Sequence, residues 1–403
     1  MNPWLRIFLP YAAGYFLSYL LRNANAVIAP ELVRELGVSS ASLGLLTSAY
    51  LLAFGAFQLP LGILLDRYGP RRVEAGLLVV AAAGSAFFAL GSSLPQLALA
   101  RAAVGLGVSA CLMASFKAFS VWFPRERLPS LNAAVMVAGS LGALTATTPL
   151  SLAVPVLGWR GVFFVLAGLA LAAAVGILST PERAQESSAE TFGQQLAALG
   201  GIVRSPVFWR YAPPTTFFVG GFMALQGLWA VPWLMHVGGH SREVAALHLM
   251  LATAGMMSGF LFIALFIGSL QRRGIHPDRV LVVAMVAGLV AMVGLVLGTA
   301  GSHLAWFVLG AVFAVGNMAY ALLSARFPPA LAGRANTALN LGVFLGAFVI
   351  QWGYGAALDL LGSRGWSPAD AHRVAAGSLL AMQAASFAWF LRRGPGAAGA
   401  GRA

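Results

Sequence analysis

The chain contains few charged residues. Only 9% of its 403 residues are Asp, Glu, Lys or Arg, whereas soluble domains carry about 25%. Hydrophobic residues make up 59% of the chain, and the mean hydropathy is +0.83. This balance excludes an ordinary soluble fold, because such a fold has too little interior to bury so many apolar side chains. The apolar runs are long and do not alternate with polar residues, so they favour membrane-spanning helices over strands.

Cysteine and lysine are almost absent, with one residue of each, Cys111 and Lys117. A single cysteine excludes a disulfide framework and a cysteine-based zinc cluster. The net charge of +13 comes almost entirely from arginines, which are scattered in ones to threes between apolar runs. They form no basic stripe, so we expect no nucleic-acid partner. We also expect no cofactor.

Twelve apolar runs of roughly 20 residues, the length that crosses a bilayer, follow one another along the chain. The first is too long for a signal-peptide core, so we interpret it as a span. The longest polar interruption, 180–210, divides the runs six and six. We therefore predict an all-α polytopic membrane protein with twelve transmembrane helices in two pseudo-symmetric six-helix bundles. The predicted parts are an N-terminal lobe at 1–180, a cytoplasmic linker at 181–210, a C-terminal lobe at 211–393 and a flexible cytoplasmic tail at 394–403.

The loops differ sharply in basic residues. With the N-terminus inside, 17 loop arginines fall on the cytoplasmic side and five on the other, namely Arg34, Arg160, Arg242, Arg364 and Arg373. Short cytoplasmic loops are enriched in Lys and Arg. We therefore expect a multi-pass protein of the cytoplasmic (inner) membrane with both termini cytoplasmic.

An internal repeat supports two related halves. Phe123 and Pro124, with Asn132 nine residues after the Phe, recur 204 residues later as Phe327, Pro328 and Asn336. Six-helix halves related in this way are typical of alternating-access transporters, whose substrate site lies near the membrane midplane between the lobes.

The loop between the second and third predicted spans contains Gly62, Asp66, Arg67, Gly69, Arg71 and Arg72. It resembles the signature cytoplasmic loop of the major facilitator superfamily. Two further patterns resemble motifs of the same family: Arg101, Gly105 and Gly107 in the fourth span, and Gly158, Trp159 and Arg160 before the sixth. The resemblance implies the fold of that superfamily. It also implies that the loop latches the cytoplasmic side in the outward-facing state, while the fourth-span residues have a structural or coupling role. Simple anchoring by positive charge is the alternative for the loop. The gating residues would be Gly62, Asp66, Arg67, Gly69, Arg71 and Arg72.

The first span carries a polar face. Tyr11, Tyr15, Tyr19 and Arg22 fall within an arc of about 80° on a helix, which predicts a cavity lining. Tyr19 to Asn23 also resembles the matching helix of organophosphate:phosphate antiporters, in which an Arg holds the substrate phosphate. Gln226 stands 204 residues after Arg22, where a second Arg of those transporters would be expected.

Arg22 is the leading candidate for substrate binding. An Arg at mid-bilayer costs about 2.5 to 3.5 kcal/mol on insertion, so it usually faces the bundle interior and has a function. Snorkelling toward the interface is its alternative, and packing is the alternative for Trp229. We interpret Arg101 as a structural tie and Lys117 as an interfacial anchor. The full set of predicted substrate-binding residues is Arg22, Tyr15, Tyr19, Asn25, Gln226, Trp229, Asn317 and Tyr320.

Acidic residues are absent from the predicted span interiors, since all twelve Asp and Glu lie in loops or at span ends. We therefore expect no proton relay in the membrane. An interior with Arg22 and Arg101 favours an anion, because Arg offers planar bidentate contacts to carboxylate or phosphate. The expected function is secondary active or facilitative transport of a small organic anion. The expected partners are this solute and the lipid bilayer, with the protein a monomer.

Two other functions are less well supported. A copper importer of the same superfamily is suggested by five histidines on the outer side and by methionines of the seventh and eighth spans, because imidazole and thioether suit copper. The Met and His spacings of four seen in such importers fail, since Gly227 follows Met223 and Ala252 follows His248. Met as core filler is the simpler account, and we predict no metal site. A membrane-embedded enzyme would need a catalytic cluster, and the spans contain none of the usual ones.

Overall fold

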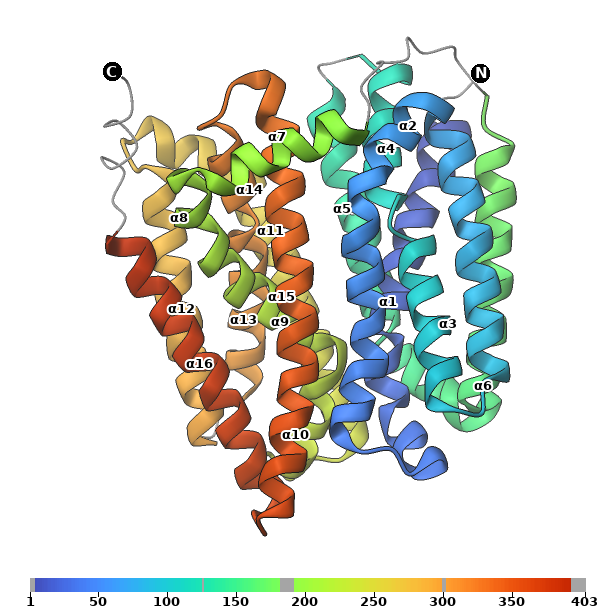
Figure 1. Ribbon diagram of the computed structural model, residues 1–403, viewed down its shortest axis with the longest axis vertical. Helices are drawn as coiled ribbons and strands as arrows, with labels where there is room; N and C mark the ends of the chain where they lie inside the picture. Colours follow the sequence, from blue (N-terminus) through green and yellow to red (C-terminus); the bar gives the residue numbers. More distant parts are fainter. Residues whose placement is uncertain (1–3, 125–126, 182–191, 299–301, 393–403) are drawn as a thin grey trace. The chain divides into compact units, whose positions relative to one another are not determined.

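The computed structural model describes residues 4–124, 127–181, 192–298 and 302–392, and within these ranges every regular element is a helix (Figure 1). The chain divides into two compact units, Met1–Phe192 and Gly193–Ala403. We call them the N-lobe and the C-lobe and describe each separately.

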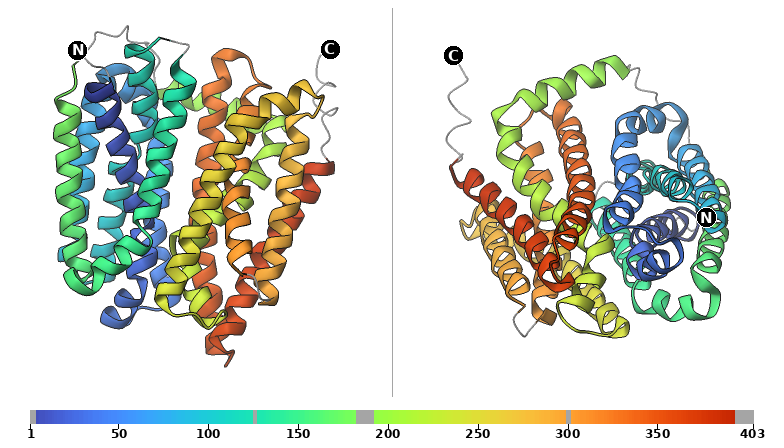
Figure 2. Two further views of the ribbon diagram at one scale, coloured as in Figure 1. Left: turned by 180° about the vertical axis from the view of Figure 1, so that it is seen from behind. Right: turned by 60° about the horizontal axis from the view of Figure 1, so that its bottom comes forward.

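The N-lobe is a bundle in which α2 packs on α3 and α6, and α1 packs on α5 and α6. Figure 2 shows these helices running alongside one another from two further sides. Its elements are η1 (Trp4–Phe8), α1 (Leu9–Leu36), α2 (Ser40–Leu90), α3 (Leu94–Gly107), α4 (Cys111–Trp122), α5 (Leu128–Thr145) and α6 (Thr148–Leu178).

The C-lobe begins with α7, and its first membrane segment is a series of short α and π turns from α8 to α10. Its elements are α7 (Phe192–Arg204), α8 (Pro206–Thr215), η3 (Thr216–Gly220), α9 (Gly221–Ala224), η4 (Leu225–Trp229), α10 (Ala230–His236), α11 (Arg242–Arg272), α12 (Pro277–Leu297), α13 (Ser302–Gly316), α14 (Met318–Ser324), α15 (Pro329–Ser363) and α16 (Pro368–Arg392).

Nine helical segments within the described ranges are long and apolar enough to cross a membrane. One of them, α2, has 51 residues and breaks at Gly69, where φ is 78° and ψ is 158°. A positive φ suits glycine because it has no Cβ, and Pro70 follows without an N–H to donate. The helix is therefore two spans joined by the signature loop. The break at Gly158 divides α6 in the same manner. These divisions favour twelve crossings, and that count stays a prediction.

The predicted linker at 181–210 lies partly outside the described residues, since 182–191 are not among them. Its described part is mostly helical, because it contains α7 and the start of α8. The predicted tail at 394–403 also lies outside the described residues.

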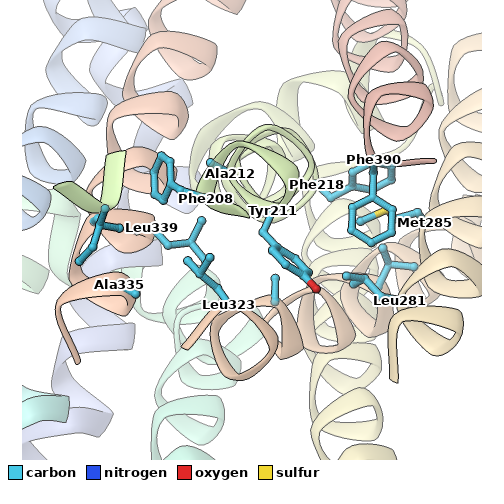
Figure 3. Close-up of a cluster of buried hydrophobic side chains, with 14 residues drawn as sticks. Phe208, Tyr211, Ala212, Phe218, Leu281, Met285, Leu323, Ala335, Leu339 and Phe390 are labelled. Atoms are coloured by element: carbon cyan, nitrogen blue, oxygen red, sulfur yellow. The ribbon is translucent and has the colours of Figure 1, made fainter. Parts of the chain in front are cut away.

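A cluster of buried hydrophobic side chains surrounds α8 in the C-lobe (Figure 3). Tyr211 is fully buried there with its ring edge against Phe390, at a centroid distance of 5.8 Å. Its hydroxyl donates to Asp278 Oδ1 at 3.1 Å. Arg210 and Arg326 each place a guanidinium nitrogen near Asp278 Oδ2, at 3.5 and 3.8 Å. The buried Asp278 carboxylate is thus surrounded by cations and a hydroxyl, as burial of a charge requires.

Candidate functional site

Two arginines of the N-lobe converge on the ring of Tyr50. The Arg101 guanidinium lies 4.9 Å from the ring centroid and that of Arg22 lies 6.0 Å from it. Arg22 also lies 4.6 Å from the Tyr19 ring and 5.0 Å from the Phe54 ring. Cation–π contacts of this kind stabilise a guanidinium in a poorly hydrated site. Two positive charges are thus held together within an aromatic surrounding.

Arg101 ties α3 to α1. Its side chain is fully buried, and its guanidinium donates to the carbonyl of Leu21 at 3.0 Å and to that of Arg22 at 3.4 Å. The structural role predicted for Arg101 agrees with this geometry. Because Arg101 binds the backbone carbonyl of Arg22, it also fixes the backbone position from which the Arg22 side chain extends.

Close helix packing brings Tyr50 to the two arginines. A Cβ on Gly105 of α3 would overlap the backbone carbonyl of Tyr50, and one on Gly107 would overlap the backbone of Ala81. The predicted structural glycines therefore allow α3 to lie directly against α2. Sequence inspection missed Tyr50 and Phe54, although their spacing of four in an apolar span is a signal for one aromatic helix face.

Tyr15, Tyr19 and Asn25 share α1 with Arg22. The Tyr15 and Tyr19 rings meet edge to face at 5.2 Å, and the Tyr15 hydroxyl donates to the Met136 sulfur at 3.6 Å, a weak acceptor. The Asn25 amide nitrogen donates to Thr47 at 3.2 Å. Its amide oxygen is buried and accepts no hydrogen bond within the part of the chain that the structure describes.

In the C-lobe, Gln226 and Trp229 lie on the π-helical turn η4. Gln226 is buried and donates to Thr253 Oγ1 at 3.3 Å. The Trp229 indole N–H donates to the Gln351 carbonyl at 2.8 Å, and its ring stacks on Tyr354 at 5.1 Å. These contacts are those of a packed side chain. Both residues stay predicted substrate contacts.

Asn317 directly precedes α14, and Tyr320 lies in its first turn. The Asn317 amide donates back to the Phe313 carbonyl at 2.7 Å, where the helix is interrupted, and the Tyr320 hydroxyl donates to Asn340 at 2.9 Å. The structure gives both a local partner within the C-lobe. Their role toward a substrate also stays a prediction.

The signature loop contacts α4 and the end of α6 in the N-lobe. Lys117 of α4 forms an ion pair with Asp66 and donates to the Leu65 carbonyl at 2.9 Å. The interpretation of Lys117 as an interfacial anchor was therefore wrong, because its charge is directed to the loop. Arg71 donates to the Leu178 carbonyl at the end of α6 at 2.9 Å, a typical way to satisfy a helix C-terminus.

The other loop residues shape or flank this turn. The Arg67 guanidinium lies over the Tyr68 ring at 5.4 Å, and Gly69 forms the turn itself. Nothing in these contacts tests the gating role predicted for Gly62, Asp66, Arg67, Gly69, Arg71 and Arg72, which stays a prediction.

Glu74 lies at a span end, as the sequence predicted, but the neighbouring helices cover that end. It follows the Gly69 break by five residues, yet its side chain is fully buried inside the N-lobe. The sequence could not show this, because the apolar run after Pro70 did not fix where the helix would be covered by its neighbours. A carboxyl group therefore lies within the bundle.

Three of the five histidines predicted on the outer side, His240, His248 and His303, form a small cluster. His248 Nε2 lies 3.1 Å from His303 Nδ1, and the His240 ring is 4.8 Å from that of His248. Within the described ranges, no group of three or more His, Cys, Asp or Glu has an arrangement that could hold a metal ion. Met223 and Met256 are buried as core side chains. The copper alternative has no support from these side chains.

At the end of the N-lobe away from the signature loop, Glu35 joins α1 to α6. Its carboxylate accepts from the Trp159 indole N–H at 2.7 Å and pairs with Arg160, which also donates to the Gly91 carbonyl at 3.2 Å. The two hydrogen bonds, from Trp159 first and Arg160 second, lower the pKa of Glu35. Trp159 and Arg160, which sequence resemblance had placed before the sixth span, are thus a structural tie.

Comparison with known proteins agrees with this fold. The chain is 29% identical over 218 residues to the hexuronate transporter of Escherichia coli K12, covering 50% of each chain. It is also 29% identical over 218 residues to the galacturonate transporter of Dickeya chrysanthemi, covering 50% of this chain and 63% of that protein. The chain thus spans about half the length of the curated relatives that it matches.

A solved structure of a bacterial homolog of the human lysosomal transporter Spinster, in an inward-facing and occupied conformation, superposes on this one. The TM-score is 0.76 at 17% identity, over 98% of this chain and 97% of that one, which shows a shared fold. The sequence pattern of the Major Facilitator Superfamily matches residues 11–351. The chain is therefore a multi-pass membrane protein that belongs to the major facilitator superfamily.

Proposed function

We propose that this protein transports a small organic monoanion of the sugar-acid class by alternating access. The observation that carries the proposal is the pair of guanidinium groups, Arg22 and Arg101, held at one aromatic ring inside the N-lobe. Charge gathered in this way inside a membrane protein marks a ligand pathway. The hexuronate and galacturonate transporters among the relatives support a carboxylate rather than a phosphate as the anionic group.

The α1 face offers complementary contacts to such a solute. Arg22 would bind the carboxylate through its planar fork, while Arg101 stays bound to the α1 backbone. The buried Asn25 amide oxygen can accept from a sugar hydroxyl, which would satisfy a group that is costly to leave without a partner. The Tyr15 hydroxyl can exchange its weak sulfur acceptor for a substrate oxygen.

We further propose that the protein acts as a monomer in the inner membrane, with both termini cytoplasmic. The 17 to 5 distribution of loop arginines supports this orientation.

Binding of D-galacturonate to purified protein tests the proposal, with D-galactose as the neutral analogue. A charge-assisted contact contributes about 1.5 to 3 kcal/mol, so Arg22→Gln should weaken D-galacturonate binding by roughly ten- to a hundredfold. Arg22→Lys should recover only part of the loss, because the ammonium lacks the planar fork. Arg364→Gln, which removes one exposed guanidinium, is the control and should bind as the wild type does. Equal losses for the acid and the neutral sugar in Arg22→Gln would contradict the proposal.

A further inference from the structure

Glu74 is a buried acid that forms no ion pair with the described part of the chain. Its carboxyl group packs against the backbone of α1 at Gly14, where an added methyl group would overlap Oε1. Neither carboxyl oxygen has a conventional hydrogen-bond partner among the described residues. The neighbouring polar group is the Cys111 thiol on α4, which is a weak donor.

The C-lobe contains an acid at the corresponding position of the repeat. Asp278 follows Glu74 by 204 residues, the repeat offset, and it is surrounded by Arg210, Arg326 and Tyr211. The N-lobe positions that correspond to these three are Arg6, which is exposed, Trp122 and Ile7. The described part of the molecule therefore holds one buried acid among cations, Asp278, and a counterpart, Glu74, for which no ion pair is found.

Each of the helices α2, α3, α4 and α6 of the N-lobe carries charged groups other than Glu74. On its own helix, Arg71 binds the end of α6, and Arg72 lies two residues before Glu74. On α4, Lys117 binds Asp66 of the signature loop. On α3, Arg101 binds the backbone of α1. On α6, Arg160 pairs with Glu35.

On α1, the titratable groups nearest in sequence to Gly14 are Tyr11 and Tyr15, followed by Tyr19 and Arg22. Cys111 is an electrostatic neighbour of Glu74 and of both Tyr15 and Arg22. The acid is thus linked through Cys111 to the face that we assign to the anion.

We propose that Glu74 is a proton-binding site that couples proton movement to anion transport, an inference that rests on the proposed function. A carboxylate buried without a cation costs several kcal/mol, so the group is a neutral acid while dry. It binds one proton to become the acid and returns that proton to water when its end of the bundle is hydrated. No other reactant is needed.

Coupling follows from repulsion between two negative charges. Arg22 lies eight residues after Gly14, or about 12 Å along the helix axis. One charge is that of the anion bound at Arg22 and the other is that of ionised Glu74. At the effective dielectric of a protein interior, two unit charges at that separation change the binding constant of the anion about tenfold. A bound anion therefore raises the proton affinity of Glu74, and by reciprocity the protonated acid favours the anion. Proton and anion then move together.

Uptake of labelled D-galacturonate into proteoliposomes tests the coupling. In the wild type, a pH gradient, acidic outside the vesicle, should drive accumulation, and the affinity should fall about tenfold as the pH rises through ionisation of Glu74. Glu74→Gln imitates the neutral acid, so it should retain counterflow but lose accumulation driven by the gradient. Asp278→Asn is the matched control at the corresponding position, and its ratio of driven uptake to counterflow should equal that of the wild type. Gradient-driven accumulation by Glu74→Gln at the wild-type ratio would overturn the inference.

Two further measurements separate this inference from the proposed function. The infrared band of a protonated carboxyl group, recorded on purified protein at neutral pH without substrate, should be present in the wild type and reduced in Glu74→Gln. An unchanged band would overturn the inference even if D-galacturonate is transported. If Glu74→Gln does not fold, Glu74→Asp keeps the acid and should retain coupling, and loss of coupling in a folded Glu74→Asp that still performs counterflow would count against it. Absence of D-galacturonate counterflow in the wild type would contradict the proposed function instead.

Discussion

Arg101 directs its guanidinium to two backbone carbonyls of α1 and stacks on Tyr50, so its charge holds a helix in place. The side chain of Arg22 is less buried than that of Arg101. Its guanidinium lies among the rings of Tyr19, Tyr50 and Phe54. Both residues carry a guanidinium group, but that of Arg101 binds backbone carbonyls and that of Arg22 contacts aromatic rings. At the scale of single residues, the site therefore separates into a fixed arginine that positions the helix and a second arginine that we assign to the solute.

The close packing of α3 on α2 requires a residue without a side chain at Gly105. Gly105→Ala would place a methyl group into the Tyr50 backbone, and overpacking of this kind typically costs about 1 to 3 kcal/mol. The thermal unfolding midpoint in detergent should fall, and D-galacturonate binding should weaken because Tyr50 moves. Gly168→Ala on α6 is the control, since an added Cβ there meets no atom within 4 Å. Equal midpoints for the two variants would mean that the close packing of α3 on α2 is not required.

At the scale of elements, the break in α2 sets where the signature loop and Glu74 lie. Gly69 adopts a positive φ between the two halves of this helix, and Lys117 and Arg71 then fasten the loop to α4 and to the end of α6. The turn, the loop contacts and the buried acid all lie within a few residues.

Two alanine substitutions on α2 should have opposite effects. Gly69→Ala places a side chain at a φ of 78° and a ψ of 158°, a region essentially restricted to glycine, and should destabilise the protein by about 1 to 3 kcal/mol. Gly76→Ala lies in regular helix with open space around it, and it should stabilise by roughly 0.5 to 1 kcal/mol. Unfolding midpoints of the purified variants measure both. A stabilising Gly69→Ala would show that the chain does not turn at this residue.

At the scale of the whole molecule, the sequence predicted the features that come from long apolar runs and from charge within them. The helical membrane fold followed from the runs, and Arg22 and Arg101 stood out as charges inside spans. Tyr50 could not be assigned, because its meeting with both arginines depends on how closely α3 packs on α2. The burial of Glu74 and the ion pair of Lys117 with Asp66 were not predicted for a related reason. A residue near a span end can face lipid headgroups or the bundle, and only the packing of neighbouring helices decides which.

The central claim is that this protein carries an organic anion across a membrane, and counterflow tests it most directly. Proteoliposomes loaded with unlabelled D-galacturonate should take up labelled D-galacturonate transiently above the outside concentration. Vesicles loaded with D-galactose should not, because exchange requires a bound carboxylate at Arg22. The account predicts rapid counterflow for the wild type and a large loss in Arg22→Gln, with Arg364→Gln unchanged. Equal uptake with either internal sugar, or undiminished counterflow in Arg22→Gln, would contradict it.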